Sequence, residues 1–114
     1  MKAVEDLYNT LKIYAEKTGY TLNPDWEILS KILEGLLRNE ERYGYRSCPC
    51  RMASGVLSED RDIICPCDYR DPDLDEYGRC LCTLYVTDDY IKGKKKYETI
   101  PDRRPIERYL KSKS

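Results

Sequence analysis

Apolar residues recur every three or four positions in the first part of the chain, and this spacing predicts two amphipathic helices. The first runs from Ala3 to about Lys17 and ends before Gly19. The second follows Asn23-Pro24-Asp25, which offers an N-cap, a proline suited to the first helical position and an early acid. It runs to about Arg42 and stops at Gly44. Its broad apolar stripe predicts that it lies between the first helix and the cysteine region and forms the floor of the core.

The pattern becomes irregular in the rest of the chain, where prolines and glycines separate short segments. A short helix capped by Ser58 and continuing through Ile63 is predicted, and Pro72 could open another through Glu76. Thr83 to Val86 suits a short extended segment, but no partner strand is evident, so no sheet is predicted. A terminal turn is expected from Ile106 to Leu110. The pattern predicts a mainly α, single small domain over residues 1–114.

The aromatic composition is unusual, because phenylalanine is absent and tyrosine occurs eleven times. The aromatic part of the core is therefore expected to consist of tyrosines and Trp26, and buried hydroxyls will need hydrogen-bond partners. Gly35 is expected to weaken the second helix slightly.

Charge and hydropathy limit the cellular locations and the binding partners that we expect for this protein. Charged residues make up 36% of the chain but nearly cancel to a formal charge of -1, so nucleic acid is an unlikely main partner. The run Lys94–Lys96 is most simply solvated surface, or alternatively a docking patch for an acidic protein. No apolar stretch is long enough to span a bilayer, and the N-terminus lacks the pattern of a signal peptide. We therefore expect a soluble cytoplasmic protein that does not contact a membrane.

Six cysteines form three Cys-x-Cys pairs, with fourteen residues between the first and second pairs and twelve between the second and third. The pairs are Cys48-Pro49-Cys50, Cys65-Pro66-Cys67 and Cys80-Leu81-Cys82. In a reducing compartment such a cluster favours metal binding or redox chemistry over a disulfide framework. The chain has no histidine, which excludes Cys/His zinc sites and histidine-based catalysis.

Several interpretations of the six thiols remain open. An iron-sulfur cluster or a structural zinc each takes four thiolates, which leaves two cysteines that can form one disulfide. Zinc knuckles usually separate their cysteines by about two to four residues, so the single-residue spacing favours iron-sulfur. The rivals are a zinc-stabilised four-thiolate module that binds nucleic acid or an acidic protein, and a bare electron carrier that would leave two cysteines unused.

Three segments with their neighbouring residues resemble the catalytic chain of ferredoxin-thioredoxin reductase. They are Tyr43–Arg51, Asp60–Cys67 and Cys80–Val86, and the likeness continues into Ile100–Pro105, so that it covers roughly residues 24–106. The resemblance implies a flat, mainly helical domain around a four-iron four-sulfur cluster. It also implies a ferredoxin-like electron donor and a thioredoxin-like disulfide substrate, with a second small subunit as a further candidate partner.

The same resemblance implies different roles for the six cysteines. Cys50 and Cys82 would form the active-site disulfide, with Cys50 as the nucleophile toward the substrate and Cys82 as the thiol that faces the cluster. Arg51, and a helix beginning there, would favour the attacking thiolate. The implied cluster ligands are Cys48, Cys65, Cys67 and Cys80.

Leu81 departs from the plant-type pattern of the family, which has histidine between the last two cysteines. The first gap between pairs is also shorter, and the second longer, than in that pattern. The resemblance therefore leaves the proton donor unassigned, and Tyr45 and Tyr69 are the nearest candidates in the sequence.

Overall fold

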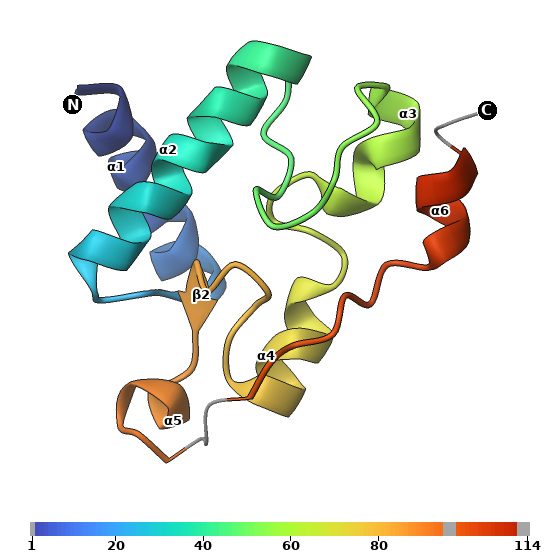
Figure 1. The fold of residues 1–114 in the computed structure, drawn as a ribbon. Helices are drawn as coiled ribbons and strands as arrows, with labels where there is room; N and C mark the ends of the chain where they lie inside the picture. The colour runs from blue at the N-terminus through green and yellow to red at the C-terminus, as the bar shows by residue number, and fades with distance from the viewer. Residues whose placement is uncertain (1, 95–97, 112–114) are drawn as a thin grey trace.

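The fold of this computed structural model, which describes residues 2–94 and 98–111, is mainly helical, as predicted (Figure 1). Its two long helices are α1 (Lys2–Thr18) and α2 (Trp26–Tyr43), which pack against each other. The core between them consists of aliphatic side chains at helical spacing, and α2 also contributes to the apolar cluster around Cys80. The predicted position of α2 beneath the cysteine region is confirmed. The buried side chains of the two helices are Val4, Leu7, Leu11, Ala15, Leu29, Ile32, Leu33 and Leu36.

The start of α2 differs from the prediction. Asp25 is the N-cap, and its carboxylate accepts hydrogen bonds from the backbone N–H groups of Glu27 and Ile28. Asn23 is buried instead, and its side-chain amide donates to the carbonyl oxygen of Thr83 at 3.2 Å. The predicted stop is confirmed, because Gly44 adopts a left-handed φ of 88° at the C-cap.

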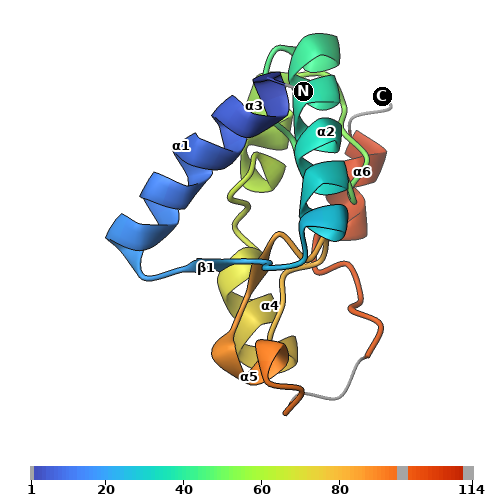
Figure 2. The ribbon, with the colours of Figure 1, turned by 90° about the vertical axis from the view of Figure 1, so that its left-hand side faces the viewer.

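A two-stranded antiparallel sheet joins the end of α1 to the loop of the third cysteine pair. Strand β1 (Thr21–Leu22) pairs with β2 (Tyr85–Val86), and Thr21 lies opposite Val86 (Figure 2). The extended segment predicted near Val86 is confirmed, but the expectation that it has no partner strand is wrong. The partner lies in the turn between the two long helices.

Short helices carry the second half of the chain. The helix predicted around Ser58 is present as α3 (Leu57–Asp60) and the 3-10 turn η1 (Arg61–Ile63), but Val56, not Ser58, occupies the N-cap position. The helix predicted from Pro72 starts two residues earlier, as α4 (Arg70–Tyr77). The expected terminal turn is α6 (Ile106–Lys111). The sequence did not predict α5 (Asp88–Ile91).

One expectation about a single residue is wrong, and a second residue has a role that the sequence did not predict. Trp26 is 47% exposed and packs edge-on against Tyr8, so it is not a core residue. The aromatic ring at the centre of the core is Tyr85, which is 1% exposed. Gly35 is more than a weak point of its helix, because a Cβ at this position would lie 2.9 Å from the Cβ of Pro49. The close approach of the first cysteine pair to α2 requires glycine there.

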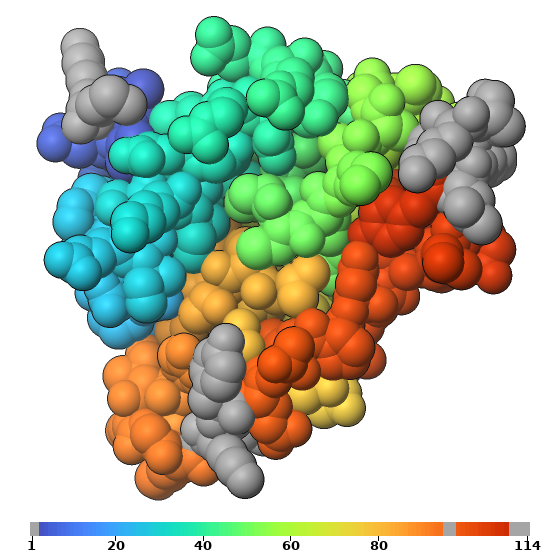
Figure 3. Space-filling view, viewed as in Figure 1, coloured from blue at the N-terminus to red at the C-terminus, as the bar shows by residue number. Residues whose placement is uncertain are grey.

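The C-terminal segment crosses one face of the molecule beside the loops of the first and third cysteine pairs (Figure 3). The principal extents are 44 × 33 × 24 Å, so the shape is flattened, as the resemblance implies. Lys94 is exposed, whereas Lys95 and Lys96 lie outside the described residues. Among the helices of the described ranges, none combines the length and the apolar character needed to cross a membrane.

Candidate functional site

The three Cys-x-Cys segments converge on one small cavity. Its wall contains both cysteines of the second pair, both of the third pair and the first cysteine of the first pair. Cys50 is not in the wall and is the one exposed cysteine of the six, all of which are free thiols in this structure. The cysteines that line the cavity are Cys48, Cys65, Cys67, Cys80 and Cys82.

Backbone hydrogen bonds hold the first two cysteine segments together. The N–H of Cys48 donates to the carbonyl of Ile63 at 2.8 Å, and the N–H of Cys65 donates to the carbonyl of Arg46 at 2.8 Å. Ser47 and Ile64 form an isolated antiparallel bridge between them. These contacts place the two pairs beside each other although fourteen residues separate them in the chain.

A tight turn before strand β2 presents the third pair. The N–H of Thr83 donates to the carbonyl of Cys80 at 2.8 Å, and Thr83 has a positive φ of 67°, which is rare for a β-branched residue. The N–H of Tyr85 donates to the sulfur of Cys80 at 3.4 Å. The β1–β2 pairing therefore fixes the turn that carries Cys80 and Cys82.

Arg51 lies where a buried cation can act on several sulfurs. Its Nη1 is 3.5 Å from the sulfur of Cys67 and 3.9 Å from that of Cys48. The Nε donates to Asp102 at 2.8 Å, and the guanidinium lies over the ring of Tyr69 at 4.8 Å. No helix begins at Arg51 within the part of the chain that the structure describes, so that expectation is wrong. The guanidinium of Arg51 therefore points toward the sulfurs of the predicted ligands Cys48 and Cys67, and not toward Cys50, its neighbour in the sequence.

Interactions among the thiols shift their pKa values in opposite directions. Hydrogen bonds from the Cys48 and Cys82 thiols lower the pKa of Cys50 well below its usual value. The pKa of Cys82 is raised well above its usual value because it acts as donor to Cys48, Cys50 and Cys80. Burial raises the pKa of Cys67 to about 11. A hydrogen bond from Cys82 also lowers the pKa of the buried Cys80. Cys50 is therefore the exposed member of the two thiols whose pKa values are lowered.

The two tyrosines nearest to the cysteines in the sequence use their hydroxyls elsewhere. Tyr45 donates a short hydrogen bond to Asp60, and Tyr69 donates to Asp62 at 2.6 Å. Neither residue lines the cavity, whereas Leu81 does. Tyr85 also lines it and was not considered from the sequence, because a tyrosine in an extended apolar segment is typical of core packing.

Charges from the C-terminal segment fix the region before the second pair. Arg104 is buried, and its guanidinium donates to Asp62 at 3.0 Å and reaches Asp60 at 3.5 Å. Arg108 adds a partly exposed contact to Asp62 at 3.1 Å. Two arginines of the C-terminal segment thus hold the segment that leads into Cys65.

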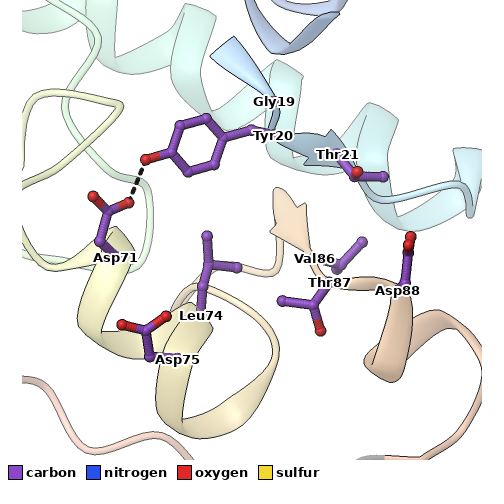
Figure 4. Close-up of a pocket in the computed structure, with 9 residues that line it drawn as sticks. All are labelled: Gly19, Tyr20, Thr21, Asp71, Leu74, Asp75, Val86, Thr87 and Asp88. Carbon is purple, nitrogen blue, oxygen red and sulfur yellow. Dashed lines mark hydrogen bonds between the residues drawn. The ribbon is translucent and has the colours of Figure 1, made fainter.

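An open groove elsewhere on the surface carries no cysteine. It lies between β1, α4 and the start of α5, has a volume of about 470 Å³, and is lined by the carboxylates of Asp71, Asp75 and Asp88 (Figure 4). The hydroxyl of Tyr20 donates to Asp71 across one end of it at 2.6 Å. The thiol chemistry therefore belongs to the cavity and not to this groove.

The donors at the cavity are thiols, which suit both zinc and iron-sulfur centres. A four-iron four-sulfur cluster is held by four thiolates spread around it, and the cavity wall contains five cysteines. The chemistry of the residues present is therefore compatible with the cluster that the resemblance implied.

The fold and this cavity define a class of small helical proteins in which several thiols surround one cavity and one further thiol reaches the surface. Comparison with known proteins assigns the family. The profile of the ferredoxin thioredoxin reductase catalytic beta chain matches residues 1–107. The chain therefore belongs to this family, whose named relatives are reductases.

Individual relatives agree with this assignment. The ferredoxin-thioredoxin reductase catalytic chain of Porphyra purpurea is 32% identical over 78 residues, which are 67% of this chain and 63% of that protein. The catalytic chain of Synechocystis sp. is 29% identical over 90 residues, 77% of this chain and 73% of that protein. The catalytic chain of Guillardia theta is 32% identical over 78 residues, which are 67% of this chain and 72% of that protein. The match thus spans less than two thirds of the Porphyra protein.

Proposed function

We propose that this chain is a cytoplasmic disulfide reductase that takes electrons from a ferredoxin-like donor and reduces a thioredoxin-like protein. The observation that carries the proposal is the separation of the thiols. Five line one cavity, and Cys50 stands exposed outside its wall. The family supports a reductase role, and its name points to the same donor and substrate.

The proposed work of Cys50 and Cys82 is a two-step thiol-disulfide exchange. The Cys50 thiolate attacks one sulfur of the substrate disulfide, and the other substrate sulfur leaves as a thiolate and takes up a proton. Cys82 then loses its proton and attacks the Cys50 sulfur, which releases the second substrate thiol and leaves a Cys50–Cys82 disulfide. Two electrons from the donor and two protons restore the dithiol. Exposure suits Cys50 to meet a protein substrate, and partial burial suits Cys82 to resolve the mixed disulfide.

In this proposal Cys48, Cys65, Cys67 and Cys80 hold a four-iron four-sulfur cluster, which would supply storage for one electron at a time beside the disulfide. Electron transfer from a ferredoxin-like donor to a thioredoxin-like substrate is thermodynamically favourable. Plant-type ferredoxins have potentials near about −400 mV and thioredoxin near about −270 mV. The difference of about 130 mV corresponds to about 6 kcal/mol for two electrons.

An anaerobic preparation analysed for iron, sulfide and zinc, with free thiols counted before and after reduction, tests the cofactor. We expect about four irons and four sulfides per chain. Two thiols should cycle between disulfide and dithiol. Zinc in place of iron and sulfide would refute the proposal.

Two serine variants test the roles of individual cysteines. Cys50→Ser should keep iron and sulfide but lose reduction of a thioredoxin disulfide by a reduced ferredoxin. Cys65→Ser should lose the cluster. Equal loss of iron from both variants would contradict the division of roles.

A further inference from the structure

The hydroxyl of Tyr85 is a buried polar group without a hydrogen-bond partner among the described residues. Tyr85 is 1% exposed, and its ring forms part of the wall of the thiol cavity. Leaving a buried hydroxyl without a partner is destabilising, because the group has lost its hydrogen bonds to water. Buried tyrosine hydroxyls therefore normally find an acceptor, and this one calls for an explanation.

The polar groups around the Tyr85 ring do not supply an acceptor. The guanidinium of Arg70 lies 4.9 Å from the ring centre, but a guanidinium can only donate hydrogen bonds. The hydroxyl of Tyr14 accepts from Arg70 at 2.9 Å, and that of Tyr20 donates to Asp71. A tyrosine hydroxyl can donate a hydrogen bond as well as accept one, so the Tyr85 hydroxyl has a proton to offer.

Sulfur atoms share the wall of the cavity with Tyr85 and are potential acceptors. Cys65 lines the same cavity, and the sulfur of Cys80 already accepts the backbone N–H of Tyr85 at 3.4 Å. Leu81 also lines the cavity, and its side chain has no donor to offer. The Tyr85 hydroxyl is therefore a donor in this wall that has no acceptor assigned to it.

We propose that the Tyr85 hydroxyl donates a hydrogen bond to a sulfur of the cluster or of its ligand Cys65, and that this bond stabilises the reduced form of the cluster. This inference rests on the proposed function. Hydrogen bonds to sulfur are among the features that set the potential of an iron-sulfur centre. The reduced form carries one more negative charge, so it gains more from a donor than the oxidised form does. Tyr85 is thus a positioning and tuning residue and takes no part in the bond exchange at Cys50.

Tyr85→Phe is the discriminating variant, because it removes one oxygen and keeps the ring and the backbone N–H. The midpoint potential of the cluster is measured by anaerobic redox titration with electron paramagnetic resonance. Reduction should become about threefold to tenfold less favourable, at about 59 mV per factor of ten for one electron. Exchangeable-proton coupling to the paramagnetic cluster, measured in ordinary and heavy water, should weaken in parallel.

Tyr20→Phe is the matched control, because its hydroxyl bonds to exposed Asp71 and it does not line the thiol cavity. It should leave the potential unchanged. A Tyr85→Phe protein with wild-type iron content and an unchanged potential would overturn the inference and leave the proposed function intact. A wild-type protein without iron and sulfide would overturn both.

A measurement on the wild type covers the case in which Tyr85→Phe does not fold. Protein grown with tyrosine that carries oxygen-17 in its hydroxyl should show hyperfine coupling of that oxygen to the cluster. Its absence would overturn the inference.

Discussion

Replacement of Gly35 by alanine tests how closely α2 supports the loop of the first cysteine pair. Pro49 lies between Cys48 and Cys50, and a Cβ at position 35 would stand 2.9 Å from its Cβ and 3.4 Å from its Cγ. Carbon atoms do not approach to 2.9 Å without displacement, and the nearer atom belongs to a stiff proline ring. We therefore expect Gly35→Ala to push the loop, and both of its cysteines, away from the helix.

Two effects of opposite sign determine the size of the change. Alanine favours a helix interior over glycine by about 1 kcal/mol. Overpacking a close contact destabilises by about 1–3 kcal/mol. The net result is a loss of up to about 2 kcal/mol in the free energy of unfolding. At about 4 °C per kcal/mol for a chain of this length, the melting temperature should fall by as much as about 8 °C.

The assay is thermal and guanidinium unfolding under anaerobic conditions, followed by circular dichroism, with iron measured in parallel. Pro49→Gly removes the opposing ring, so the double variant should lose less stability than the sum of the single variants. Glu34→Ala, at an exposed neighbouring position, is the control for a change on α2. A Gly35→Ala protein more stable than the wild type would refute the argument, because helix propensity alone would then explain the result.

Three further predictions concern surface and buried charges. Arg104→Met should lower the free energy of unfolding by about 3 kcal/mol, because it removes the arginine paired with buried Asp60 and leaves Asp62 with the partly exposed Arg108. Arg108→Met, at a partly exposed position, should change it by less than about 1 kcal/mol, and equal losses in denaturant titrations would contradict this contrast. Burial alone would raise the pKa of Asp62, but its hydrogen bonds and neighbouring guanidinium groups hold that pKa below its usual value. The stability it provides is present above the unfolded pKa of about 3.9 and is lost as the pH falls toward the folded pKa. Denaturant midpoints of Asp62→Asn should therefore depend less on pH in this range, and parallel curves would refute this. Lys94→Glu should weaken docking of a ferredoxin-like donor most at low ionic strength, whereas unchanged kinetics would identify Lys94 as ordinary surface.

Helix periodicity was sufficient to predict the two long helices, but not the residue that caps the second. Asn23 and Asp25 are both good caps by chemistry. The choice between them depends on Thr83, 60 residues away, whose carbonyl oxygen accepts from Asn23 and so removes it from the helix end. The sheet could not be predicted for a similar reason. Its strands of two residues are too short to show a period, and each pairs with a strand far away in the sequence, Thr21 with Val86 and Leu22 with Tyr85.

The cysteine spacing predicted that the thiols would gather, and the structure places five of them around one cavity. What the spacing could not predict is the direction of the neighbouring side chains. Arg51 follows Cys50 in sequence, yet Asp102 and Tyr69 turn its guanidinium toward Cys67. Adjacency along the chain was a poor guide to these partners, because they arrive from the C-terminal segment and from the second cysteine loop.

The contacts of the C-terminal segment with residues far earlier in the sequence also affect the order in which the chain folds. Asp102 holds Arg51 from 51 residues away, and Arg104 reaches Asp62 from 42 residues away. Chains are made from the N-terminus, so the residues that complete the surroundings of the thiols are among the last to be synthesised. The first cysteine loop and the segment before the second pair can therefore reach their final arrangement only after the C-terminal segment has folded onto them.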